Sequence, residues 1–470
     1  MSMTDSSQKR IVVAGATGFI GTELGQHLAG QHHLIGLTRS NRAQITHYNE
    51  TRRVDLFSRQ DTIDALKNAD VAVYLVHSMM PSARLVQASF DVLDLLCADN
   101  FAYAAAANKI KHIIYIGGLQ PTGDQNSKHL QSRKEVEQAL AAHGVPVTTL
   151  RAGLVIGGKG SSFQILRRLV QRLPTMICPS WTNTLTSPVA ISDVTWAIDK
   201  VIQHEEPKTA VYDLGVTSPV TYKKLMAQTS FAMGLSRTFI PIPLVTPTLS
   251  RLWVSLVTGA PKALVAPLIH SLQYQMVARN DPLFRLVNDP KTPIDKILPQ
   301  AVRTANESDV KPRAFRRLNT PKSAPKVLSV QRAPLKAGQG PTWAADLYLK
   351  WLPSTMRGFN PISVTIDGDI VEFRLGSKGL LLLSFQRQQR EDFATFVITG
   401  GCLAKTNHKG RLEFRSALNN TILLIGVYDF EPRLPWWIYR FTQATFHLWV
   451  MKRFIRFLST QNHHQTNRLN

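Results

Sequence analysis

Ile11-Val12-Val13-Ala14-Gly15-Ala16-Thr17-Gly18-Phe19-Ile20-Gly21 is the stretch that decides the fold of this 470-residue chain. Its four leading apolar residues predict a buried strand, and the spacing of Leu24 and Leu28 predicts a helix directly after the glycines. The first glycine permits a tight turn, the second leaves room for a diphosphate beside the backbone, and the third lets the helix pack on the strand. The pattern therefore predicts a dinucleotide site at a strand-to-helix turn.

Strands and helices keep alternating after this turn. Apolar runs predict strands, and helical spacing predicts helices, at His33–Leu37 (strand), Asp61–Leu66 (helix), Val71–Val76 (strand), Ala83–Lys109 (helix), His112–Ile116 (strand) and Val147–Leu150 (strand). Such alternation is typical of a parallel sheet with helices on both faces. We expect a doubly wound α/β (Rossmann) domain over residues 9–290, with a small substrate lobe from about residue 154 to 290.

The last third of the sequence has a different pattern. Consecutive apolar runs joined by turns such as Asp367-Gly368 and Lys409-Gly410 predict an antiparallel sheet. The expected strand segments are Ile362–Leu375, Gly379–Arg387, Phe393–Leu403, Arg411–Ala417 and Leu423–Asp429. Trp437, Phe441, Ala444, Leu448, Met451, Ile455 and Leu458 are spaced to line one face of a single final helix. We expect an antiparallel α+β domain over 341–460. The preceding segment, 291–340, is rich in Pro, Lys, Arg and Ser and is interpreted as a basic linker, in which Ile294–Leu298 and Val327–Val330 could be ordered.

Composition limits the classes of function. The 44% hydrophobic content excludes wholesale disorder, and 55 Lys and Arg against 32 Asp and Glu give a net charge of +23. No zinc finger, RNA-recognition signature or basic zipper accompanies this charge, so we do not expect nucleic-acid binding. The three cysteines are widely separated and indicate neither a disulfide framework nor a metal site. Without a recognisable signal peptide or membrane span, we expect a cytoplasmic protein.

The end of the second strand bears on the choice of dinucleotide. NAD sites usually place an acidic residue there, whereas this chain has Arg39, Ser40 and Arg42. The two arginines could pair with a 2′-phosphate and Ser40 could donate to it, which favours NADP, with NAD possible; alternatively, the arginines are ordinary solvated loop residues. The predicted cofactor-binding residues are Gly15, Thr17, Gly18, Phe19, Ile20, Gly21, Arg39, Ser40, Arg42, Asp55, Leu56, Val76, His77 and Gly117. Asp55 could equally be a helix cap.

Three later phrases carry a family resemblance: Tyr74-Leu75-Val76-His77-Ser78-Met79, His129-Leu130-Gln131-Ser132-Arg133 and Arg172-Leu173-Pro174. With the glycine turn, they make residues 9–290 resemble an atypical, extended-type short-chain dehydrogenase/reductase of the NmrA-like and epimerase-like group. The resemblance implies NAD(P)-dependent oxidoreductase chemistry on a small molecule. Catalytic members of the superfamily carry a Tyr and a Lys four residues apart on the helix after the fifth strand.

This chain departs from that catalytic pattern. His129 stands at the tyrosine position and Arg133 at the lysine position. Because residues four apart share a helical face, both could point at the nicotinamide, with His129 as general acid or base and Arg133 binding ribose or a carboxylate. In the alternative interpretation, the domain binds its cofactor without turnover and serves as a sensor or as an assembly or scaffold protein. His77 is interpreted as a structural residue beside the cofactor.

The C-terminal strands, ending in Tyr428-Asp429-Phe430-Glu431-Pro432-Arg433, resemble more weakly the START-like, helix-grip accessory domain of the same group. Such a fold could enclose an apolar ligand, and the expected partners are therefore a small-molecule substrate or an apolar ligand. The aromatic and basic residues of the final helix are expected mainly to form core. Peripheral contact with an anionic membrane is the second possibility for them. The sequence does not indicate an oligomeric state.

Overall fold

The computed structural model describes residues 8–40, 44–77, 85–121, 127–204, 206–242, 254–259, 269–279, 292–307, 326–355, 362–376, 380–390, 393–405 and 409–466. The chain folds as two compact units. One consists of residues 1–80 and 97–316, and the other of residues 81–96 and 317–470. None of the described helices is both long enough and apolar enough to cross a membrane.

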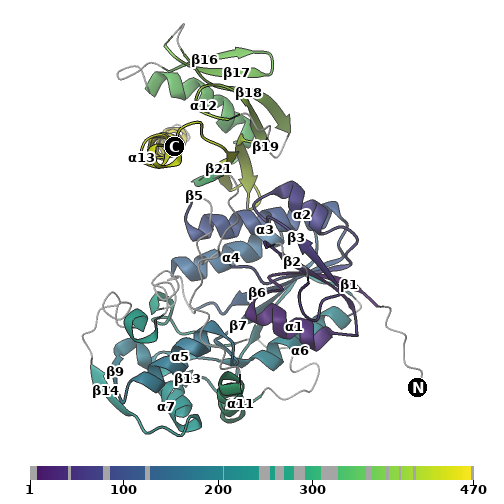
Figure 1. The fold of residues 1–470 in the computed structure, drawn as a ribbon, viewed down its shortest axis with the longest axis vertical. Coiled ribbons are helices and arrows are strands. Elements are labelled where there is room, and N and C mark those ends of the chain that lie inside the picture. Colours follow the sequence, from purple (N-terminus) through teal and green to yellow (C-terminus); the bar gives the residue numbers. More distant parts are fainter. Residues whose placement is uncertain are drawn as a thin grey trace. The chain divides into compact units, whose positions relative to one another are not determined.

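A seven-stranded parallel sheet forms the centre of the first unit (Figure 1). Its strands are, in spatial order, β12 (Ala210–Leu214), β7 (Val147–Ala152), β6 (His112–Gly118), β4 (Val71–Tyr74), β1 (Arg10–Ala14), β2 (His33–Thr38) and β3 (Glu50–Arg53). The order reverses at β1, which pairs with β2 on one side and β4 on the other. In sheets of this kind, ligands bind at the carboxyl ends of the strands beside such a reversal. The prediction of a Rossmann-like parallel sheet is confirmed.

Helices cover both faces of this sheet. Helices α1 (Phe19–Leu28) and α6 (Ile191–Gln203) lie on one face, where Leu24 and Leu28 share a core with Val194 and Ile198. Helices α2 (Arg59–Ala65), α3 (Phe90–Ala107) and α4 (Lys128–Leu140) lie on the other face (Figure 1). Burial on both faces explains why the central strands are almost continuously apolar.

The expected helix at Ala83–Lys109 is only partly correct. A short strand, β5 (Leu85–Gln87), precedes α3, and the two units divide within that helix, after Leu96. Strand β5 pairs in parallel with β15 (Val327–Pro334) in the second unit. This pairing joins residues about 240 positions apart, as the Gln331 to Gln87 hydrogen bond also does, and local periodicity carries no information on such partners.

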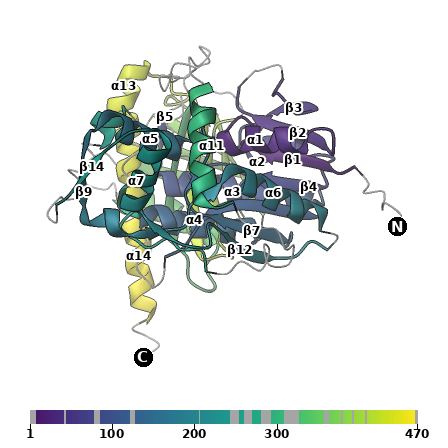
Figure 2. The same ribbon diagram turned by 90° about the horizontal axis from the view of Figure 1, so that it is seen from below.

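The second lobe of the first unit contains α5 (Ser161–Arg172), α7 (Tyr222–Ala232) and α11 (Ile294–Glu307). It also contains the short elements β8 (Val155–Ile156), β9 (Thr175–Pro179), η1 (Ser180–Asn183), β10 (Leu185–Thr186), β11 (Val189–Ala190), β13 (Val220–Thr221) and β14 (Thr238–Ile242). Helix α11 lies beside α5 and α7 (Figure 2). Its residues Ile297, Leu298 and Val302 are buried in the lobe core. The segment expected to be a linker over 291–340 therefore begins with a packed helix, longer than the ordered run that the sequence indicated.

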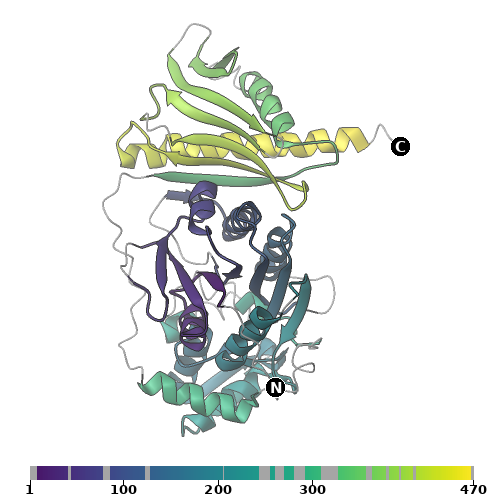
Figure 3. The ribbon, with the colours of Figure 1, turned by 90° about the vertical axis from the view of Figure 1, so that its right-hand side faces the viewer.

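An antiparallel sheet forms most of the second unit. After β15 and α12 (Pro341–Thr355), the chain runs through β16 (Ile362–Asp367), β17 (Ile370–Leu375), β18 (Leu381–Arg390), β19 (Phe393–Gly400), β20 (Arg411–Ala417) and β21 (Ile422–Phe430). These six strands form a meander, and β15 pairs with β21 at its far edge. Figure 3 shows the long helix α14 (Gln443–Thr466) running across the strands.

The final helix is broken, contrary to the sequence expectation. Helix α13 (Trp436–Phe441) ends before Thr442, whose backbone dihedrals of −112° and −85° leave the helical region before α14 begins. Because of this break, the apolar residues of α13 and α14 do not lie on one continuous helical face. Met451 and Leu458 are buried as expected, whereas Trp437 is 69% and Phe441 74% exposed.

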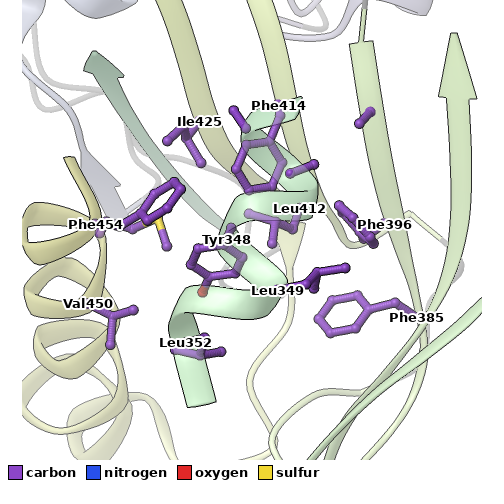
Figure 4. Packing of buried hydrophobic residues seen from close by; sticks show 14 of the residues in the cluster. Tyr348, Leu349, Leu352, Phe385, Phe396, Leu412, Phe414, Ile425, Val450 and Phe454 are labelled. Atoms are coloured by element: carbon purple, nitrogen blue, oxygen red, sulfur yellow. The ribbon is translucent and has the colours of Figure 1, made fainter. Parts of the chain in front are cut away.

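Aromatic packing holds α12 and α14 to the sheet. The Tyr348 ring on α12 lies 5.0 Å from the Phe454 ring on α14 and 5.6 Å from the Phe414 ring on β20. Figure 4 shows Tyr348 between Phe454 and Val450 on α14 and the phenylalanines of the sheet. Burial raises the pKa of Tyr348, so its hydroxyl stays protonated at neutral pH.

Candidate cofactor site

The glycine turn after β1 is packed so closely that side chains are excluded at two positions. Gly15 has a φ of +91°, a conformation that favours glycine. A Cβ added at Gly21 would lie 2.3 Å from the Gly15 carbonyl oxygen and 2.7 Å from the Ala16 Cα. The first turn of α1 thus rests directly on the backbone of the turn, as the spacing of the glycines predicts.

Gly18 occupies the open side of this turn. Its N–H donates to the Gly15 carbonyl at 2.9 Å, and within 4 Å an added Cβ would meet only that oxygen, at 3.1 Å. Thr17 and Gly18 are exposed, and no side chain caps α1. The helix therefore presents uncapped N–H groups and its positive end at this point, which suits a diphosphate.

The phenylalanine of the glycine motif is fixed by a second glycine-rich loop. Added Cβ atoms at Gly157 and Gly160 would lie 2.6 and 2.9 Å from the Phe19 ring. One at Gly158 would lie 2.6 Å from the Ala305 backbone nitrogen on α11. This packing could not be inferred from the sequence, where the loop had only its glycine content as a signal.

The carboxyl end of β2 carries the predicted ribose-binding residues. Thr38 is buried, and its hydroxyl accepts a hydrogen bond from the Ser40 N–H at 3.2 Å and lies 3.1 Å from the Ser40 hydroxyl. Arg39 is exposed. Arg42 lies outside the described residues. The described part of this strand end offers a cation and a hydroxyl and has no acidic side chain between Leu37 and Ser40.

The alternative interpretation of Asp55 as a helix cap is wrong. Helix α2 is capped by Ser58, whose hydroxyl accepts from the Asp61 N–H at 3.2 Å. The Asp55 carboxylate instead accepts from the Phe57 N–H at 3.2 Å, within the loop after β3. The Leu56 carbonyl accepts from the Asn100 side chain at 2.8 Å, which ties this loop to α3.

Two histidines meet near the carboxyl ends of β4 and β6. The chain leaves β4 with the Leu75 N–H donating to the Ala14 carbonyl at 2.9 Å, and Val76 and His77 follow. The His77 ring centroid lies 5.1 Å from that of His129, near the start of α4. Gly117, close to the end of β6, pairs with Arg151 on β7. The sequence predicted a role at the site for each histidine, but it did not predict that the two are neighbours.

Arg133 has a different environment from His129, although both lie on α4. It is only 8% exposed, and its Nη1 donates to the Tyr115 hydroxyl at 3.3 Å. That hydroxyl lies 3.4 Å from the Arg133 carbonyl, to which it can donate. Tyr115 is a buried residue of β6, and nothing in the sequence singled it out as the partner of Arg133.

Comparison with known proteins supports nucleotide binding by this part of the chain. Residues 15–173 match the family model described as NAD(P)H-binding. The auxiliary protein GraX of Staphylococcus aureus is 30% identical over 142 residues, which is 30% of this chain and 43% of that protein. The chain thus matches less than half the length of this curated relative.

Solved structures show the same fold. A nucleoside-diphosphate-sugar epimerase from Staphylococcus aureus superposes with a TM-score of 0.50 at 19% identity, covering 62% of this chain and 100% of that one. The Citrobacter sp. triphenylmethane reductase complexed with NADP(H) gives a TM-score of 0.50 at 20% identity, covering 62% and 99%. At these identities, the likeness shows the fold of the first unit.

Substitutions at Gly21 and Gly18 should have contrasting effects on stability and on nucleotide binding. Gly21→Ala should destabilise the fold by about 2 kcal/mol, a loss of roughly 4–8 °C in Tm, because its Cβ meets backbone atoms that cannot move aside. Gly18→Ala should change Tm little but weaken dinucleotide binding at least tenfold, because its Cβ points to the open side. Calorimetric titration and thermal melts distinguish the two. Equal binding by Gly18→Ala and the wild type would contradict this account of the turn.

The match to the family model begins at Gly15, the residue that turns the chain out of β1. It ends at Leu173, just after α5, and so includes the uncapped end of α1 and both histidines. Residues 15–173 therefore match an NAD(P)H-binding domain, and the structure places them on a Rossmann-like parallel sheet.

Proposed function

We propose that the first unit is an NAD(P)-dependent oxidoreductase that reduces or oxidises a small, carbonyl-containing or apolar molecule, with His129 transferring the proton. The observation that carries the proposal is the proximity of His129 and His77, 5.1 Å apart between ring centroids, near the strand ends where this fold binds ligands. Imidazole titrates near neutral pH and can act as donor or acceptor. The binding of NAD(P) by this domain supports redox chemistry at the same edge.

When held at the glycine turn formed by Gly15, Gly18 and Gly21, NAD(P) would supply or accept the hydride at the substrate carbon. His129 donates a proton to the carbonyl oxygen during reduction and accepts it back during oxidation. His77 lies close enough to act as a positioning residue for the His129 ring. The half-buried state of both histidines leaves them partly screened from water.

Removal of the His129 imidazole should separate two kinds of substrate. Reduction of an aldehyde such as 4-nitrobenzaldehyde needs both a hydride and a proton, whereas a cationic triphenylmethane dye accepts a hydride alone. We therefore expect His129→Ala to slow NADPH-dependent aldehyde reduction by about 10²-fold or more and to leave dye reduction nearly unchanged. Absorbance at the nicotinamide and dye bands measures both reactions.

The control variant is His143→Ala. His143 is also a histidine of the first unit, but it pairs with Asp99 at 2.9 Å and packs against Tyr103. It should leave both rates unchanged. If wild-type protein reduces neither the aldehyde nor the dye, or if His129→Ala retains full aldehyde activity, the proposed proton transfer is wrong.

We propose further that NADP is preferred to NAD. The exposed Arg39 and the adjacent Ser40 support this preference, because a guanidinium and a hydroxyl suit a 2′-phosphate, whereas the carboxylate that usually binds a ribose 2′-hydroxyl does not occur between Leu37 and Ser40. Nothing in the described part of that strand end repels a phosphate.

Arg39→Ala should raise the Kd for NADPH roughly tenfold and leave the Kd for NADH unchanged, because only NADPH carries the extra phosphate. Lys111→Ala is the matched control, since Lys111 is an exposed cation just before β6, at the amino ends of the strands and not at their carboxyl ends. Fluorescence titration measures both constants. Tighter binding of NADH than of NADPH by the wild type would contradict the preference.

A second candidate function is cofactor binding without turnover, as in a sensor or an assembly protein. The environment of Arg133 favours it, because its guanidinium bonds to Tyr115 within the core and is buried there. In the catalytic proteins that the chain resembles, the residue at this position instead binds the nicotinamide ribose. The aldehyde and dye assays decide between the two candidates.

We propose that the second unit is a helix-grip, START-like domain. Support comes from its chain order of one strand, a helix, a six-strand meander and a long final helix. The pairing of β15 with β21 at the edge of the meander also supports it. Both α12 and α14 pack on one aromatic core with the sheet.

A further inference from the structure

The second unit contains a cavity of about 130 Å³ between its sheet and α14. Its wall consists of Val, Leu, Ile and Phe side chains together with Ser329, Tyr348, Tyr439, Gln443 and His447. No Asp, Glu, Lys or Arg lines it among the described residues. An apolar cavity of roughly 150 Å³ binds benzene, so this cavity, which is similar in volume, can hold a molecule of about one small ring or a short branched chain.

Two polar atoms in this wall are buried and lack partners. The Gln443 Oε1 and the His447 Nε2 have no hydrogen bond to any described residue. The two residues are four positions apart on α14, so they share one helical face, and both line the cavity. A buried polar atom without a partner is costly, and such atoms are rare in folded proteins.

The ionisable groups in the wall are neutral at physiological pH. Burial lowers the pKa of His447 to about 4 and raises the pKa of both Tyr348 and Tyr439. With neither a cation nor an anion in its wall, the cavity cannot compensate the charge of a carboxylate or an amine. The cavity can instead form the hydrogen bonds that a buried hydroxyl needs, because a hydroxyl both donates and accepts a hydrogen bond.

We propose that this cavity binds an uncharged, largely apolar molecule about the size of one substituted ring, whose single hydroxyl bonds to Gln443 and His447. The ligand hydroxyl donates its proton to the Gln443 Oε1 and accepts a hydrogen bond from the His447 Nε2–H. Phe446 lines the cavity and is 48% exposed, so this side chain separates the cavity from the surface of the second unit. The inference is independent of any redox activity in the first unit.

Three probes of similar size test the proposal by calorimetric titration of the full chain. We expect 4-methylphenol to bind at least tenfold more tightly than toluene, and 4-methylbenzoate not to bind. In Gln443→Leu/His447→Leu, the preference for the phenol should disappear while toluene binding persists, with Tm unchanged or raised because two unsatisfied groups are removed. Lys452→Leu, at an exposed position of α14 outside the cavity wall, is the control.

A variant that fills the cavity tests whether the probes bind at this site. Ile398 is 4% exposed and lines the cavity, so Ile398→Phe should abolish binding of both neutral probes. The proposal is overturned if wild-type protein binds neither probe, if the benzoate binds as tightly as the phenol, or if the leucine variant keeps the preference. The binding of these probes to the second unit does not depend on whether the first unit reduces aldehydes.

The outer surface of α13 and α14 carries exposed aromatic side chains. Trp437, Phe441 and Trp449 are 69%, 74% and 45% exposed. Arg440 lies 5.7 Å from the centre of the Phe441 ring, and Arg453 lies 5.4 Å from that of Trp449. From Arg433 to the last residue, the sequence has no Asp or Glu.

We propose that this aromatic-basic surface, formed by Trp437, Arg440, Phe441, Trp449 and Arg453, binds the surface of an anionic membrane. Exposed tryptophans beside arginines are typical of helices that lie in the lipid headgroup region, and the absence of acidic residues removes repulsion from anionic lipid. The exposed aromatics favour lipid over a DNA duplex, because a duplex is bound mainly through the charge of its phosphates.

Sedimentation with vesicles tests this surface. The wild type should pellet with phosphatidylcholine vesicles that contain about 30% phosphatidylserine, less so at high salt, and not with pure phosphatidylcholine. Trp437→Ala/Phe441→Ala/Trp449→Ala should reduce binding at least tenfold, whereas Phe231→Ala, an 88% exposed aromatic of the first unit, should not. Absence of pelleting, equal pelleting of the triple variant, or preferred binding of a DNA duplex in competition would overturn the proposal.

Discussion

The contact between the first turn of α1 and the turn after β1 is the constraint on which the first unit depends. With 2.3 Å between a notional Gly21 Cβ and the Gly15 oxygen, only glycine lets the helix start where it does. That start leaves the helix uncapped beside the exposed Gly18, and it aligns α1 with α6 over the sheet. The same geometry thus sets the helix packing and opens a place for a diphosphate.

The sequence predicted the parts of the structure that are encoded locally. The glycine turn, the buried strands His33–Leu37 and His112–Ile116 and the meander from residue 362 are visible because period and turn chemistry act over a few residues. The structure extends these strands by a residue or two. Strand β20 matches the expected run Arg411–Ala417 because charged and apolar residues alternate in it.

The features that could not be predicted depend on long-range contacts. Strand β5 is only three residues long, and it is a strand because it pairs with β15. Helix α11 is amphipathic but lies in a segment whose composition indicated a linker. At the site, the neighbouring His77 and His129 rings and the bond from Arg133 to Tyr115 join different elements. Spacing along α4 placed His129 and Arg133 on one face but could not show that Arg133 is bonded within the core.

The central claim is that the uncapped end of α1 binds the diphosphate of a pyridine nucleotide. Isothermal titration of the wild-type chain with NADPH and NADH tests it most directly. The account predicts saturable heat at one nucleotide per chain, with the stronger binding for NADPH. Absence of measurable heat with either nucleotide, from protein that melts cooperatively, would contradict it.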